Sequence, residues 1–150
     1  MTGLNHAVTG ATVAAAINRP IIALPAALLS HFLVDMIPHW NYKVPGGPAG
    51  RIKVMILDLI MSLSLLIVLA LTVNAIPWVV FFGGLLAISP DVMWLEFFLT
   101  GRTSIKGSSK RLVNRVRRFH LWIQLSETSW GILVEAVWFV LMLTLIYQVI

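Results

Sequence analysis

Long runs of apolar residues, separated by short polar segments, dominate the chain. A helix needs about 20 mostly apolar residues to cross a bilayer. Three runs have that length: residues 52–73, residues 76–99 and roughly residues 121–150. A tight turn over residues 74–77 joins the first two of these runs as a hairpin. We therefore predict a membrane-spanning helix for each run.

The N-terminal part of the chain is also apolar but has a different organisation. Its apolar stretch covers residues 4–37, which is too long for one crossing, and an Asn-Arg-Pro turn interrupts it at residues 18–20. Proline suits the first turn of a helix, so a second helix is expected to begin there. The pattern predicts a short helix over about residues 5–17 and a longer one over about residues 20–37.

Residues 110–123 show a third pattern, in which apolar and basic side chains share a helix. The apolar residues recur at helical spacing, at Leu112, Val116, Phe119 and Ile123. This spacing, with arginines beside it, predicts an amphipathic helix that lies in the membrane interface. The segment is either a basic connector that fixes topology or a binding surface for anionic lipid head groups. The basic side chains that would bind the head groups are Lys110, Arg111, Arg115 and Arg118.

Composition supports a membrane protein. The chain of 150 residues is 59% hydrophobic and 11% charged, whereas soluble domains average roughly 25% charged residues. We predict an all-α integral membrane protein with a single domain over residues 1–150. It would be a five-helix bundle with one short N-terminal helix and four longer membrane helices, plus the amphipathic helix. Despite the net charge of +5, this composition argues against a nucleic-acid partner, and the lack of cysteine excludes thiolate sites.

The basic residues predict the orientation. Three of the 11 lie in residues 40–53 and seven in residues 100–118. One hairpin separates these segments, so both lie on the same side of the membrane, and the positive-inside rule makes that side cytoplasmic. We expect a protein of the cytoplasmic (inner) membrane with its N-terminus and basic loops in the cytoplasm and no cleavable signal peptide. The oligomeric state is left open, with a homo-oligomer as one option.

The acidic residues lie where charge is unfavourable. All six fall within or at the edge of the apolar helices: Asp35, Asp58, Asp91, Glu96, Glu127 and Glu135. An ionisable side chain in hydrocarbon costs at least about 2.5 to 3.5 kcal/mol, so each needs a partner or a function. The predicted topology puts several acids and all four histidines at one depth: His6, His31, Asp35, His39, Asp58, Asp91 and His120.

This set of residue types favours a metal site. His31 and Asp35 are four residues apart and share a helix face, and His39 follows Pro38 at the helix end. Imidazoles and carboxylates are typical ligands of zinc or a similar divalent ion. We predict one or two such ions, bound by ligands drawn from His6, His31, Asp35, His39, Asp91 and His120. The alternative is that the histidines are simply hydrogen-bonded core residues.

The acids outside this ligand set have other expected roles. Asp58, as well as Asp91, is a candidate general base. Glu96 is expected to pair with an arginine of the basic segment, and Glu135 to make a helix-packing hydrogen bond. The role of Glu127 is left open.

Two resemblances point to hydrolysis. Residues 31–39, His-Phe-Leu-Val-Asp-Met-Ile-Pro-His, resemble the H-[FY]-L-x-D-x(n)-P-x-H signature of the zinc-dependent phospholipase C and zinc nuclease superfamily, with a shorter gap before the last histidine. That resemblance implies His31, Asp35 and His39 as zinc ligands. The layout also resembles small bacterial inner-membrane proteins described as membrane-bound metal-dependent hydrolases, whose first histidine and Pro-Asp pair correspond to His6 and Pro90-Asp91.

The expected function is metal-dependent, phospholipase-like hydrolysis of a membrane lipid or amphiphilic phosphoester at the cytoplasmic face, by metal-activated water. Two alternatives stay open. One is a divalent-metal transporter or carrier, although transport sites usually lie near the membrane midplane between inverted repeats. The other is a structural or scaffold membrane protein whose acids pair with histidines for packing.

Overall fold

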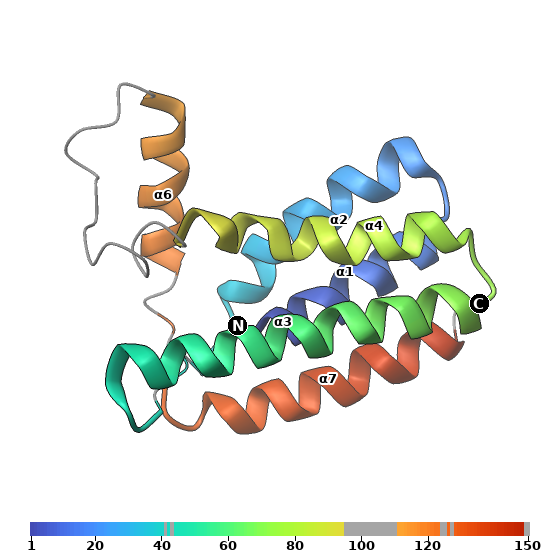
Figure 1. Cartoon of the computed structure of the whole chain (residues 1–150). Helices are drawn as coiled ribbons and strands as arrows, with labels where there is room; N and C mark the ends of the chain where they lie inside the picture. The colour runs from blue at the N-terminus through green and yellow to red at the C-terminus, as the bar shows by residue number, and fades with distance from the viewer. Residues whose placement is uncertain (41, 43, 95–110, 124–125, 127, 149–150) are drawn as a thin grey trace.

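Helices make up most of the chain in a computed structural model, and the described residues contain no β-strand (Figure 1). The structure describes residues 1–150 except 41, 43, 95–110, 124–125, 127 and 149–150. The α-helices are α1 (Gly3–Ile17), α2 (Pro20–Asp35), α3 (Gly47–Thr72), α4 (Pro77–Ile88), α6 (Arg111–Ile123) and α7 (Gly131–Gln148), and a 3-10 helix, η1 (Ser89–Trp94), continues α4. The predicted all-helical class is confirmed.

Helix α1 lies in the middle of the bundle. It is built mainly from small residues, and 11 of its 15 residues are buried. Helices α2, α3, α4 and α7 all pack against it (Figure 1). The helix that was predicted to be the shortest is therefore the core around which the other four assemble.

Glycine allows α1 and α4 to approach closely. A Cβ atom at Gly10 of α1 would lie 2.5 Å from the Cβ of Ala87 and 2.6 Å from the carbonyl oxygen of Gly83, both in α4. A Cβ atom at Gly83 would in turn collide with Ala14 of α1. Small residues at such crossings bring two backbones into direct contact, as they do in membrane helix pairs.

The bundle helices alternate in direction, which gives the molecule two distinct ends (Figure 1). The N-terminus of α1, the last turn of α2, helix η1 and helix α6 lie at one end, which we call the α6 end. The opposite end holds the α1–α2 connection, the α3–α4 turn and the last turn of α7. At that end Asn18 adopts a left-handed conformation (φ 47°) that terminates α1, and its Oδ1 accepts a hydrogen bond from the backbone N–H of Ile76 at 3.1 Å.

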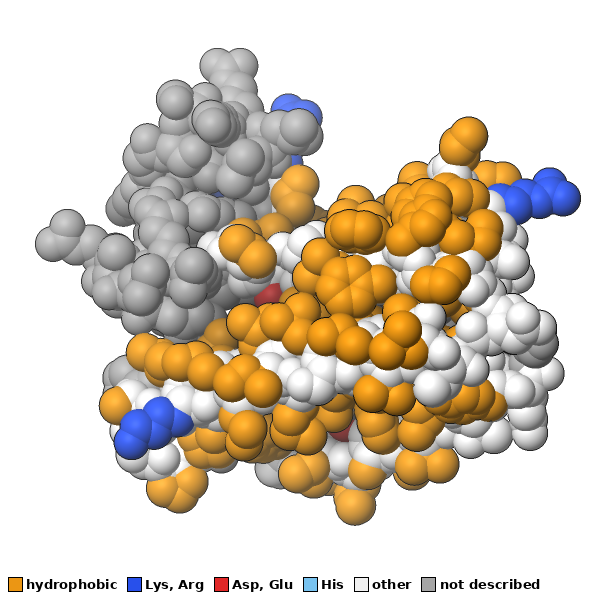
Figure 2. All heavy atoms as spheres, turned by 45° about the vertical axis from the view of Figure 1, so that its right-hand side comes forward, with side chains coloured by type: hydrophobic (Ala, Val, Ile, Leu, Met, Phe, Trp, Pro, Cys, Tyr) orange, Lys and Arg blue, Asp and Glu red, His pale blue; other side chains and the backbone are white. Residues whose placement is uncertain are grey.

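Apolar side chains cover much of the outer surface (Figure 2). Ala49–Thr72 and Gly131–Gln148 are long and apolar enough to cross a membrane. In the most apolar 18 residues of each helix, only 17% and 22% of the residues are buried inside the protein. Pro20–Asp35 and Pro77–Met93 are shorter apolar helices. Lysine and arginine side chains lie at the two ends of the face in Figure 2. Soluble monomers rarely expose apolar patches of this extent.

Two predicted helix boundaries were wrong. Residues 121–150 do not form one helix, because α6 ends at Ile123 and α7 begins at Gly131. Between them the backbone bonds to the segment after α2: the Thr128 N–H donates to the His39 carbonyl oxygen at 2.8 Å, so it is not used in a continuous helix. The α-helix predicted over residues 76–99 stops at Ile88 and gives way to η1, because Pro90 has no N–H to continue the helical hydrogen bonds.

Candidate metal centre

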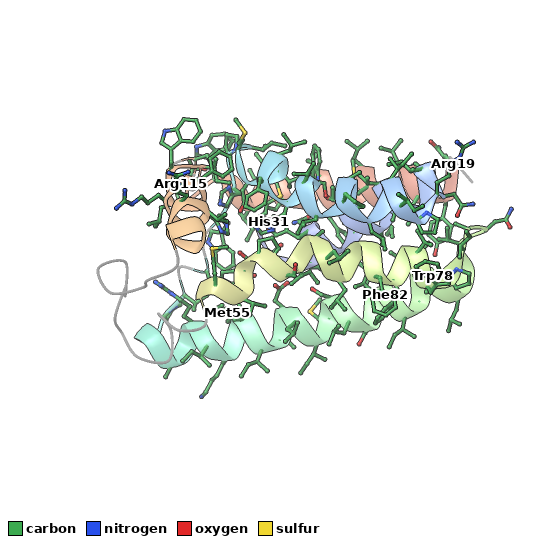
Figure 3. The ribbon with its side chains drawn as sticks, turned by 90° about the horizontal axis from the view of Figure 1, so that it is seen from above. Arg19, His31, Met55, Trp78, Phe82 and Arg115 are labelled. Carbon is green, nitrogen blue, oxygen red and sulfur yellow. The ribbon has the colours of Figure 1, made fainter. Side chains whose placement is uncertain are left out.

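Four side chains from three separate elements meet at the α6 end. They are His31 and Asp35 of α2, Asp91 of η1 and His120 of α6, and one ligand atom from each lies within 4.8 Å of all the others. His31, Asp35 and His120 are fully buried, and the side chain of Asp91 is 30% exposed. Figure 3 shows His31 in the interior of the molecule, between the ribbons of the bundle. This group could hold a metal ion.

Local structure explains how each element contributes. The last turn of α2 places His31 and Asp35 one turn apart on the buried face. The 3-10 turn that follows Ser89-Pro90 brings Asp91 towards the same point. Helix α6 turns His120 and Ile123 inwards, and both are buried. Residues separated by 89 positions in the chain thus share one site.

Three of the distances in the group are close to those of a small tetrahedral site. Asp35 Oδ2 lies 3.3 Å from His31 Nε2 and 3.0 Å from His120 Nε2, and the two Nε2 atoms are 3.2 Å apart. Asp91 Oδ1 is 3.8 Å from each of these Nε2 atoms. Nitrogen and oxygen ligands about 2.0–2.1 Å from zinc are about 3.3–3.4 Å from one another in a tetrahedron. His31, Asp35 and His120 therefore have the spacing of three ligands of such an ion, and Asp91 lies farther out.

The hydrogen bonds of the two imidazoles orient them for metal binding. His31 Nδ1 lies 2.7 Å from the carbonyl oxygen of Ala87, so Nδ1 carries the proton and donates it. His120 Nδ1 faces the sulfur of Met93 at 3.4 Å, which is also an acceptor. In the neutral rings the lone pairs are then on the Nε2 atoms, which point at each other and at the Asp35 carboxylate. A cation between these groups would neutralise the carboxylate and satisfy the lone pairs, and a backbone carbonyl on the second nitrogen is typical of metal-bound histidine.

His6 lies beside the group on α1. Its ring stacks on His31 with centroids 4.0 Å apart, and its Nε2 is 3.1 Å from Asp35 Oδ1. Within the part of the chain that the structure describes, neither ring nitrogen of this buried histidine has a well-formed hydrogen bond. The α-ammonium group of Met1 contacts the same oxygen of Asp35. Asp35 thus faces His31 and His120 with Oδ2, and His6 and Met1 with Oδ1.

His39, a predicted ligand, lies apart from the four-residue group. Its Nδ1 donates to the carbonyl oxygen of Ile37 at 2.8 Å, and its backbone bonds to Ser126 and Thr128. Burial lowers the pKa of His39, so the ring is neutral near pH 7. In this structure His39 holds the segment after α2 against the chain that precedes α7.

Asp58, a predicted general base, caps the N-terminus of α1. Its carboxylate accepts hydrogen bonds from the backbone N–H groups of Gly3 at 2.7 Å and Leu4 at 3.1 Å. It also accepts a bond of 2.6 Å from the hydroxyl of Tyr42. Burial and the charge of Asp58 raise the pKa of Tyr42, which keeps the phenol protonated. Asp58 therefore interacts with the start of α1 and is not one of the four clustered side chains.

Glu135 of α7 bonds to the same region of α1. Its Oε2 accepts hydrogen bonds from the backbone and hydroxyl of Thr2 and from the Asn5 amide, and its Oε1 accepts one from the Trp40 N–H. This is the packing hydrogen bond expected for a buried acid. Tyr42, Met93 and Thr2 carry no sequence pattern that predicts them as partners of these groups. Glu96, Glu127 and Lys110 lie outside the described residues, as does the side chain of Arg111.

The chain matches no protein-family model, and comparisons with curated proteins and with solved structures give no significant match. The resemblances to zinc-dependent phospholipases and to membrane-bound hydrolases therefore stay predictions.

Proposed function

We propose that this chain is an integral membrane protein that binds a divalent metal ion, zinc or a similar one, and hydrolyses a membrane lipid or amphiphilic phosphoester at the cytoplasmic face. The observation that carries the proposal is the buried His31, Asp35 and His120 group with the partly exposed Asp91 beside it. Two imidazoles and two carboxylates suit zinc better than magnesium or calcium, which prefer oxygen ligands alone.

The apolar outer surface supports membrane insertion. Large apolar side chains such as Ile21 and Leu71 are 89% and 80% exposed, and they continue along the outward faces of α2 and α3. In water this surface would be unfavourable by roughly 25 cal/mol for each Å² of apolar area. In lipid it is the expected outer surface of a helix bundle.

The unequal spacing within the four-residue group favours catalysis over a purely structural site. His31, Asp35 and His120 lie 3.0 to 3.3 Å from one another, whereas Asp91 is 3.8 Å from both histidines. Catalytic zinc sites have three protein ligands and one open position. A bound divalent ion supplies Lewis-acid chemistry, since it lowers the pKa of a bound water to about 7 and polarises a phosphoryl oxygen.

Asp91 is the residue that we assign to proton transfer. It is the only one of the four with substantial exposure, so it can reach both the ion and an incoming substrate. A carboxylate at hydrogen-bond distance from the attacking water is a suitable general base. The buried His31 and Asp35 hold the site together from α2, and His120 closes it from α6.

The position of the site favours hydrolysis over transport. Its ligands lie in the last turn of α2, in η1 and in α6, towards the α6 end of the bundle (Figure 1). If the bundle spans a membrane, this end lies near the head groups, where the phosphoester bonds of lipids also lie. Transport sites usually lie near the midplane instead.

Head-group or phosphate release from lipid–detergent micelles tests the proposal. The zinc-loaded protein should release product from at least one class of phospholipid or amphiphilic phosphoester. Asp91→Asn should lose this activity, and Tyr147→Phe, at the opposite end of the bundle, should keep it. A metal-replete protein that is inert towards a broad panel of such amphiphiles would overturn the proposal. So would Asp91-dependent uptake of a divalent ion into proteoliposomes without hydrolysis, which would indicate a carrier.

A further inference from the structure

Helix α6 has an exposed surface that does not belong to the candidate metal site. Unlike α1, α2, α3, α4 and α7, it lies across the α6 end of the bundle and not along it (Figure 1). If the bundle spans a membrane, a helix in this orientation lies along the membrane surface. In Figure 3 the side chain of Arg115 on α6 points away from the molecule, at the end opposite to Arg19.

The outward stripe of α6 combines arginine with aromatic side chains. Arg115, Arg118 and Trp122 follow one another at helical spacing, and all three are exposed. Phe119 lies on the same side, is 46% exposed, and contacts the Trp122 ring at a centroid distance of 6.1 Å. Arginine and tryptophan together are typical of helices at the boundary between lipid head groups and acyl chains.

Charge complementarity selects the occupant of this stripe. The exposed arginines are complementary to an anionic partner, and Trp122 and Phe119 to an apolar one; an anionic bilayer surface offers both. Exposed apolar residues of α2 at the same end, Leu33 and Met36, would continue the contact into the acyl region. Near an anionic membrane surface each such arginine strengthens binding about fivefold.

The inward face of α6 carries a ligand of the candidate metal site. His120 is fully buried, and its Nε2 lies 3.0 Å from Asp35 Oδ2. The same helix therefore has one exposed face and another face that is turned towards the metal site. Two ligands that both stabilise one position of a helix strengthen each other's binding reciprocally.

We propose that α6 binds anionic lipid head groups through Arg115 and Arg118, and that this binding increases the affinity of the metal site by holding His120 in place. The proposal deepens the proposed function and depends on it for the metal. It makes the metal site sensitive to the lipid composition of the surrounding leaflet.

The zinc affinity of the full chain in lipid nanodiscs tests the coupling. A fluorescent zinc chelator competes with the protein, once in phosphatidylcholine and once in phosphatidylcholine with phosphatidylglycerol. Zinc should bind at least about fivefold more tightly in the anionic discs, within the usual range of coupling between two sites. The double variant Arg115→Gln/Arg118→Gln should lose this difference. Arg19→Gln, which removes one positive charge at the opposite end, should keep it.

A second measurement tests the anchor without metal. The chain has no cysteine, so Leu121→Cys accepts a single spin label on α6, and its accessibility to oxygen and to a water-soluble nickel chelate gives its depth. The label should lie at head-group depth in anionic discs. A fully water-exposed label would overturn the anchor, and equal zinc affinity in both lipids would overturn the coupling. If the wild type binds no zinc, the proposed function fails, while the depth result still decides the anchor.

Discussion

Asp58→Asn separates a structural role of Asp58 from a catalytic one. In the structure Asp58 Oδ2 accepts bonds from Gly3 N–H and the Tyr42 hydroxyl, and Oδ1 accepts one from Leu4 N–H. Asparagine has the same shape but only one acceptor oxygen. If that oxygen keeps the Gly3 and Tyr42 bonds, the new amide group faces the Leu4 N–H, and two donors oppose each other.

The expected loss of stability follows from these contacts. A hydrogen bond to a charged group contributes about 1.5–3 kcal/mol. The negative charge near the N-terminus of α1 contributes about 0.3–1 kcal/mol more through the helix dipole. Asp58→Asn should therefore lower the free energy of unfolding by about 2–4 kcal/mol. Tyr42→Phe removes one of the three donors to Asp58, so it should have a smaller effect, and the double variant should cost less than the sum of the two.

Reversible unfolding in mixed detergent micelles, followed by tryptophan fluorescence, measures this change. Metal content, determined on the same samples, should equal that of the wild type, because Asp58 does not belong to the four-residue group. If Asp58→Asn unfolds like the wild type but loses its metal, Asp58 is a ligand and the assignment as a helix cap is wrong.

Three further perturbations address packing, protonation and metal binding. Gly10→Ala should destabilise the bundle by about 1–3 kcal/mol, because the added Cβ meets the Gly83 carbonyl oxygen, whereas Val68→Ala on the exposed side of α3 should have little effect in the same unfolding assay. Because the pKa of His39 is lowered in the folded protein, the unfolded chain binds more protons than the folded one below about pH 6.5. The free energy of unfolding should therefore decrease as the pH is lowered below that value. His39→Asn, which keeps a donor for the Ile37 carbonyl, should reduce that slope, and an unchanged slope would contradict the assignment. A chelator should lower the thermal midpoint of the wild type but not of Asp35→Asn, since an ion at 100 times its Kd stabilises by about 2.7 kcal/mol.

The meeting of distant residues at one end could be predicted from the sequence. Helix length and the basic segments give the direction of each helix, and direction gives depth along the bundle. Depth alone places His31, Asp35, Asp91 and His120 at the same end, and the four-residue spacing puts the first two on one face. The amphipathic pattern of residues 110–123 also corresponds to α6, which covers Arg111–Ile123.

Depth does not determine which way a side chain points around its helix, so the partners of Asp58 could not be predicted from the sequence. Asp58 lies at the right depth, but it faces the N-terminus of α1, whose first N–H groups have no capping bond from Thr2. Those donors need acceptors from elsewhere, and Asp58 of α3 supplies them, with Glu135 of α7 bonding to the preceding Thr2 N–H. The sequence could not indicate this role, because Thr2 is itself a favoured capping residue, and only the structure shows that its hydroxyl donates to Glu135 instead.

The break between α6 and α7 also depends on contacts that the sequence does not show. Residues 121–150 are apolar enough for one continuous helix. The backbone pairing of His39 with Thr128 and the close approach of Gly131 to the His39 carbonyl group redirect the chain before α7 begins. This redirection lets α6 lie across the end of the bundle with His120 in the site.

Metal analysis by mass spectrometry of the detergent-purified protein tests the central claim most directly. Wild type, Asp35→Asn and Tyr147→Phe are prepared side by side and dialysed against the same zinc-containing buffer and then against metal-free buffer. We predict about one zinc ion for each chain in the wild type and in Tyr147→Phe, and little or none in Asp35→Asn. A wild type without bound metal, or an Asp35→Asn variant that retains as much as the wild type, would contradict the account.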